Sequence, residues 1–60
     1  MSYRDWCSVV LEEPEANKFR GFLRYKKIKY EPSGYGNKTH FSVFVNAKEL
    51  KMCSDFLERL

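Results

Sequence analysis

The spacing of apolar residues changes repeatedly along these 60 residues, and that changing period constrains the fold more than any other feature. Apolar and polar positions alternate over 3–11, as in a strand with one buried face. Over 13–27 the apolar residues recur every three or four positions, as in an amphipathic helix. Alternation returns over 28–31 and 38–45, and helical spacing returns over 47–60. The sequence therefore predicts a single small α+β domain with the order β-α-β-β-α.

Residues with strong local preferences mark the ends of these elements. Pro14 suits the first turn of a helix, where its missing N–H is harmless. Residues 32–37 form a Pro- and Gly-containing turn cluster that would join two strands as a hairpin. Asn46 suits a helix N-cap, and Glu49 completes a capping-box pattern. The stripes expected to face the core are Ala16, Phe19, Phe22 and Leu23 on the first helix, and Leu50, Cys53, Phe56, Leu57 and Leu60 on the second.

The element order predicts a three-stranded sheet with strand order 1-3-2. A right-handed crossover through the first helix would set strands one and three side by side and parallel. The hairpin would then place strand two beyond strand three. Both helices would cover one face of the sheet, because only one face of each strand is consistently apolar. This arrangement is a ferredoxin-like fold truncated before its final strand.

Such a fold leaves two surfaces available for binding. Strand one is an edge, and its residues 6–11 are flat and apolar, which favours pairing with another strand. The sheet face away from the helices would carry Trp6, Val10 and Phe44 among polar residues that include His40. We expect one or both surfaces to bind another protein or a second copy of the chain. The alternatives are that the N-terminal residues or Asp5 shield the edge, and that the three apolar residues are scattered.

The basic residues are concentrated in one segment. Residues 16–30 hold six lysines and arginines and no acid, although the whole chain has a net charge of only +3. Arg20, Arg24 and Lys27 fall on one side of the predicted helix. They form either a solvated face or a stripe that binds an anionic partner, such as an acidic protein surface or nucleic acid. Sheet aromatics beside a basic helix favour single-stranded RNA, but the third strand lacks the glycine of the RNP1 pattern.

The sequence offers little for catalysis or metal binding. His40 is the single histidine, and the predicted alternation points it away from Cys7 and Cys53. A nucleophile–histidine pair would need these side chains together, and a zinc finger would need local ligand spacing. We therefore predict no enzyme activity, no metal and no cofactor. The Gly34–Gly36 segment is expected to be a turn, with Tyr35 at its tip as a contact residue.

The chain lacks the signals of secretion and membrane insertion. No apolar run is longer than that of residues 9–11, and three residues are too few to span a bilayer. The first residues show no basic region followed by an apolar one. Two cysteines 46 positions apart are typical of core residues in a reducing compartment, not of a disulfide scaffold. We expect a cytoplasmic protein without a membrane partner.

The order of elements resembles small β-α-β-β-α domains of the ACT-like and signal-transducing type. The likeness rests on a helix such as Glu15–Tyr25, an apolar strand at Phe41–Val45 and a final helix opened by a capping residue. In size, in lysine and aromatic content and in its lack of motifs, the chain also resembles phage-encoded inhibitors of host proteins. The leading hypothesis is a self-associating protein-binding module that acts by occlusion. The alternatives are a single-stranded nucleic-acid binder and an ACT-like regulatory dimer that binds a small ligand.

Overall fold

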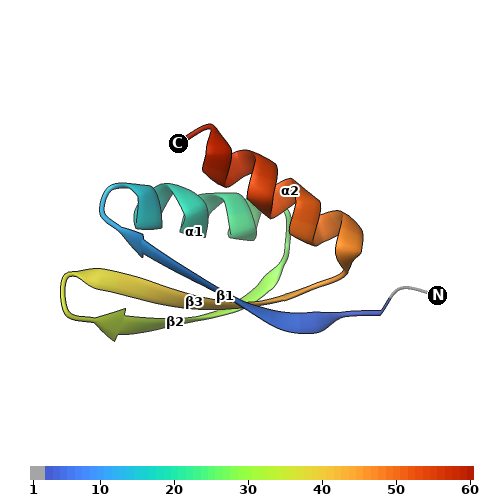
Figure 1. The fold of residues 1–60 in the computed structure, drawn as a ribbon, viewed down its shortest axis with the longest axis horizontal. Coiled ribbons are helices and arrows are strands. Elements are labelled where there is room, and N and C mark those ends of the chain that lie inside the picture. Colours follow the sequence, from blue (N-terminus) through green and yellow to red (C-terminus); the bar gives the residue numbers. More distant parts are fainter. Residues whose placement is uncertain (1–2) are drawn as a thin grey trace.

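The computed structural model describes residues 3–60, apart from the side chain of Tyr35. It confirms the α+β fold and the β-α-β-β-α order (Figure 1). The elements are β1 (Asp5–Glu12), α1 (Glu15–Tyr25), β2 (Lys29–Tyr35), β3 (Lys38–Val45) and α2 (Ala47–Glu58). Both helices lie on the same side of the sheet, so the opposite face is left without a covering element in the described part of the chain (Figure 1).

The strand order is β1-β3-β2, as predicted, but the predicted direction of β1 relative to β3 is wrong. β1 and β3 are antiparallel, with Trp6 opposite Phe44 and Val10 opposite His40. β2 and β3 are also antiparallel. The crossover through α1 returns the chain to β2, which runs parallel to β1 with β3 between them. Because β3 is the hairpin partner of β2, it must run opposite to both.

The hairpin between β2 and β3 is tighter than the predicted loop over residues 32–37. β2 continues to Tyr35, and only Gly36 and Asn37 form the turn. Gly36 has a φ of 64°, and glycine at the first central position is what a two-residue turn of type II′ requires. Pro32 is tolerated within β2 because this strand is an edge of the sheet.

The core lies between the helices and the inner face of the sheet. Phe19 on α1 is fully buried and packs edge-to-face on Phe41 of β3, with 5.3 Å between ring centroids. Phe22 on α1 stacks on Phe56 of α2 at 4.4 Å and so joins the two helices. The buried side chains are Ala16, Phe19, Leu23, Ile28, Phe41, Val43, Val45 and Cys53.

The predicted apolar stripe of α2 is only partly used. Cys53 is buried, and Phe56 and Leu57 pack half-buried against the core. Leu50 and Leu60 remain exposed. The stripe of α1 is better covered, since only Phe22 is not fully buried.

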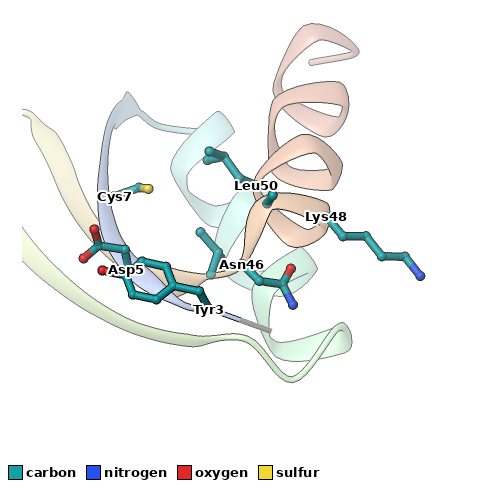
Figure 2. Close-up of a pocket in the computed structure, with 8 residues that line it drawn as sticks. Tyr3, Asp5, Cys7, Asn46, Lys48 and Leu50 are labelled. Carbon is teal, nitrogen blue, oxygen red and sulfur yellow. The ribbon is translucent and has the colours of Figure 1, made fainter. Parts of the chain in front are cut away.

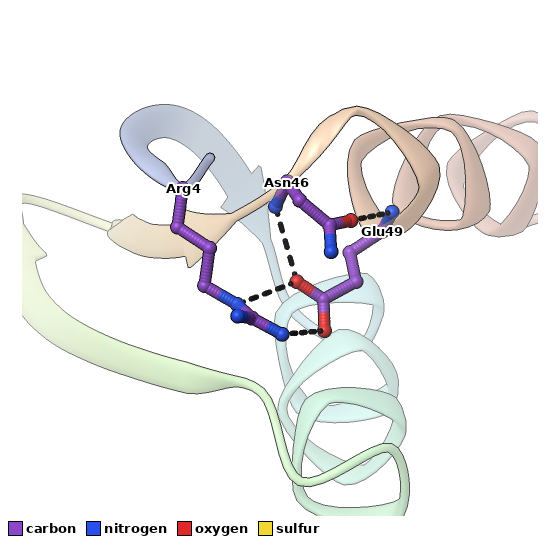
Figure 3. Close-up of polar contacts among 3 residues, drawn as sticks. All are labelled: Arg4, Asn46 and Glu49. Carbon is purple, nitrogen blue, oxygen red and sulfur yellow. Dashed lines mark hydrogen bonds and ion pairs between the residues drawn. The ribbon is translucent and has the colours of Figure 1, made fainter. Parts of the chain in front are cut away.

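The two helices end in different ways. At the start of α2, the Asn46 side chain accepts a hydrogen bond from the Glu49 N–H at 2.8 Å, and the Glu49 carboxylate accepts one from the Asn46 N–H at 3.1 Å. This confirms the predicted capping box (Figure 3). α1 ends two residues earlier than predicted, at Tyr25. Lys27 follows with a φ of 58° in the left-handed region, and the Ile28 N–H donates to the Leu23 carbonyl at 2.9 Å, as in a Schellman motif.

Candidate binding surface

The side of the sheet away from the helices is called the outer sheet face here. Its side chains follow from the strand registers, because residues opposite each other in neighbouring strands share a face. The residues are Trp6, Ser8, Val10 and Glu12 on β1, Lys38, His40, Ser42 and Phe44 on β3, and Lys29, Glu31 and Ser33 on β2. The predicted positions of Trp6, Val10, His40 and Phe44 on one face are therefore confirmed.

Trp6 and Phe44 form an aromatic pair at one end of the outer sheet face. They are opposite each other in the register, and their ring centroids are 5.0 Å apart. Trp6 is 44% exposed. Lys29 lies on the other side of Phe44 in the same row, and its ammonium group reaches over the Trp6 ring, 5.9 Å from the centroid. Aromatic pairs of this kind contribute about 0.5–1.5 kcal/mol beyond their area burial.

A groove occupies the other end of the outer sheet face. Val10, His40 and Ser33 form one row across the three strands. Together with Gly34 and Lys38 they line a groove of about 580 Å³. Val10 is 51% exposed, whereas His40 is half-buried. Ser8 separates Trp6 from Val10 along β1. The apolar areas at the two ends of the outer sheet face are therefore distinct.

The charges on the outer sheet face balance. Lys29 and Lys38 are positive, and Glu12 and Glu31 are negative. Of the six basic residues in 16–30, Lys29 lies on the outer sheet face, whereas three lie on α1 and two directly follow it. α1 is on the other side of the sheet (Figure 1). The sheet aromatics and the basic helix therefore do not form one continuous surface.

The predicted basic stripe of Arg20, Arg24 and Lys27 is not fully assembled. Arg20 is half-buried, and its guanidinium lies over the ring of Phe41, 5.7 Å from the centroid. Arg24 is exposed in the last turn of α1. Lys27 lies beyond the end of the helix in a left-handed conformation, so the helical spacing that grouped it with Arg20 does not extend to it.

The other residues considered for contact or chemistry are Tyr35, His40, Cys7 and Cys53. The side chain of Tyr35 lies outside the described part of the structure. His40 is on the outer sheet face, whereas Cys7 and Cys53 face the core. Burial, followed by the charge of Glu49 and the nearby Cys7, raises the pKa of the Cys53 thiol above its usual value. A thiol with a raised pKa is a poor nucleophile, so Cys53 behaves as a core residue.

Sequence reasoning missed a second groove, which lies between β1 and the start of α2. It has a volume of about 540 Å³. Figure 2 shows Cys7 on β1 and Leu50 on α2 pointing toward each other across it, whereas Lys48 points away. The sequence hint of this groove is Leu50, an apolar residue in the stripe of α2 that remains exposed. Which strand lies beside it depends on where α2 crosses the sheet.

The N-terminal segment contacts α2 through an ion pair. Arg4 binds the Glu49 carboxylate with both Nε and a terminal nitrogen, at 3.1 and 3.2 Å (Figure 3). Hydrogen bonds from Arg4 and from the Asn46 backbone hold the pKa of Glu49 below its usual value. The contact directs the Arg4 side chain toward the helical side of the sheet, away from the outer sheet face.

Comparison with known proteins finds no matching family model, no matching curated protein and no matching solved structure. Neither of the helices described here is long and apolar enough to cross a bilayer.

Proposed function

We propose that the chain is a non-enzymatic protein-binding module that uses the outer sheet face to cover the surface of another protein. The observation that carries the proposal is the pairing of exposed Trp6 with half-buried Phe44 on a face that no other element of residues 3–60 covers. Tryptophan is among the residues that most often dominate binding energy at protein interfaces, where apolar anchors sit within a polar rim. A single domain of 60 residues would act by occlusion. When bound, it would cover a surface of the partner that other molecules would otherwise contact.

Charge distribution favours a protein partner over nucleic acid. Phosphate contacts supply much of the affinity for nucleic acid and require a basic surface. The outer sheet face carries equal numbers of positive and negative groups. The basic residues of α1 lie on the other side of the sheet, so one strand of RNA would have to pass around the molecule to use both surfaces.

The position of Lys29 is a second argument against base stacking. Its ammonium group already lies over the Trp6 ring, and the row Lys29–Phe44–Trp6 requires its alkyl chain to cross Phe44. A stacked base would have to displace this side chain from the aromatic pair. A protein partner with an acidic group beside an apolar pocket would instead keep Lys29 in place and pair with it.

The proposal is tested by capture with matched variants. The tagged chain, Trp6→Ser and Arg24→Glu are compared as baits after nuclease treatment, with circular dichroism to show that each variant is folded. Both substitutions change exposed side chains, but on opposite sides of the sheet. We expect Trp6→Ser to weaken binding of the captured protein by about 30-fold or more, the scale of a truncated hot spot, and Arg24→Glu to leave it unchanged.

Two outcomes would contradict the proposal. One is a captured protein that Trp6→Ser retains and Arg24→Glu loses, which would move the binding surface to α1. The other is captured material that disappears with nuclease and whose binding weakens steeply with salt, which would indicate a nucleic-acid binder.

A further inference from the structure

β1 has the composition of a central strand but lies at an edge of the sheet. Its inward-facing residues are only half-buried, whereas Phe41 and Val43 on β3 are fully buried. Its outward-facing Trp6 and Val10 are exposed. A flat, apolar strand at the edge of a sheet presents unpaired backbone groups to which a further strand can add.

The two edges of the sheet differ in how well they are protected. β2 contains Pro32, which has no N–H to offer a neighbouring strand. β1 offers six consecutive uncharged residues, 6–11, between the acidic residues Asp5 and Glu12. Strand addition is therefore favoured at β1.

The backbone of β1 is directed so that alternate residues face the free edge. The Trp6 N–H donates to the Asp5 carboxylate at 2.8 Å, so it points away from β3. In an antiparallel strand, residues two apart direct their N–H and C=O groups to the same side. Ser8 and Val10 therefore also direct their backbone groups to the free edge. The Asp5 carboxylate accepts the hydrogen bond of the Trp6 N–H at this edge. A pairing strand would replace the carboxylate as the acceptor.

We propose that β1 pairs antiparallel with β1 of a second copy, with Ser8 on the two-fold axis. Opposite residues in an antiparallel pair share a face, so the axis must pass through a residue and not between two. Centred on Ser8, the pairs within β1 are Trp6 with Val10, Cys7 with Val9, Ser8 with Ser8 and Asp5 with Leu11. The three central pairs match apolar with apolar and serine with serine, and Asp5 opposite Leu11 lies at each end of the paired segment.

The neighbouring registers fit the strand less well. A centre at Cys7 would place Trp6 opposite Ser8. A centre at Val9 would place Trp6 opposite Glu12, an aromatic side chain against an acidic one. The self-complementarity of the Ser8 register favours a second copy of the chain as the partner of β1.

The pairing would join the two apolar areas of the outer sheet face. Val10 of the second copy lies beside Trp6, so Phe44 and Trp6 continue into Val10 and His40 of that copy. Trp6 also reaches the rim of the second copy's groove, which Val10 lines. The partner surface proposed above would then span six strands. The extension of the partner-binding surface rests on the proposed function, whereas the pairing of the two β1 strands does not.

Cross-linking tests the register. In a Cys7→Ala background, Ser8→Cys puts two thiols on the axis, within reach of a disulfide after a small adjustment. Val10→Cys is the matched control on the same exposed side of β1, and its thiols would be offset by four residues, about 14 Å along the strands. Mild oxidation should give covalent dimers of Ser8→Cys only. Equal cross-linking of both variants, or cross-linking of the wild-type chain through Cys7, would overturn the register.

Sedimentation tests the pairing itself. The wild-type chain should be a reversible dimer at high micromolar concentration, since one strand per copy makes a small interface. Ser8→Lys places two ammonium groups on the axis and should give a monomer, whereas Ser8→Thr should remain dimeric. A wild-type monomer at these concentrations would overturn the pairing. If the wild-type chain were a monomer but Trp6→Ser still abolished capture of a partner protein, the proposed function would stand without the β1 pairing.

Discussion

At the scale of single residues, Lys27 shows how tertiary contacts override a local preference. A residue with a side chain in the left-handed region costs about 1–2 kcal/mol relative to ordinary backbone. The chain accepts this cost because the turn brings Ile28 back over Leu23, and both side chains are buried. Sequence reasoning extended α1 through Lys27 because lysine is a good helix former and gives no sign of a C-cap. A glycine there would have marked the end of the helix.

Lys27→Gly should stabilise the protein. Glycine removes the left-handed penalty, but it loses about 0.5–1 kcal/mol more backbone entropy than alanine on folding. The net gain should be about 0.5–1 kcal/mol, or several degrees in Tm for a domain of this size. Thermal denaturation measures it, with Lys27→Ala as the control that keeps the strain and should give no gain. A lower Tm for Lys27→Gly would show that the lysine side chain is needed there.

At the scale of elements, the sequence predicted best where local chemistry and period agree. The capping box of α2 and the faces of β1 and β3 follow from neighbouring residues, and the structure confirms them. β2 was missed beyond residue 31 because Pro32, Ser33 and Gly34 have turn preferences. They form a strand because β3 supplies a long partner and because an edge position tolerates proline.

Glu49→Gln should weaken the start of α2 in a pH-dependent way. The pKa of Glu49 is lowered in the folded state, so its charge stabilises the fold above the unfolded value near 4.5. That contribution is lost as pH falls through the lower folded pKa. Because Arg4 is 43% exposed, solvent screening limits the loss at neutral pH to about 0.5–1 kcal/mol.

Denaturant unfolding of Glu49→Gln at neutral and acidic pH measures this effect. The difference from wild type should disappear once Glu49 is protonated in the folded state. Glu58→Gln makes the same change at the other end of α2, where an acidic group is not favoured by the helix dipole, and should cost nothing. A loss that persists unchanged at low pH would assign the effect to the side-chain shape and not to the charge.

At the scale of the whole molecule, element order and strand order could be predicted, but the relations between surfaces could not. The exposed positions of Trp6 and Val10 followed from alternation along one strand. The reach of Lys29 over Trp6 and the groove beside Leu50 depend on strand register and helix placement, which no local pattern specifies. The separation of the basic helix from the outer sheet face likewise emerges only from the layered fold.

If the outer sheet face binds a partner protein, the backbone amide signals of its residues should respond to that partner. NMR spectra of the isotope-labelled chain, recorded as the captured partner is added, follow these signals one by one. We expect the signals of Trp6, Val10, His40 and Phe44 to shift or broaden first, while those of Arg20 and Arg24 stay in place. Changes confined to α1, with the strand signals unmoved, would show that the outer sheet face is not the binding surface.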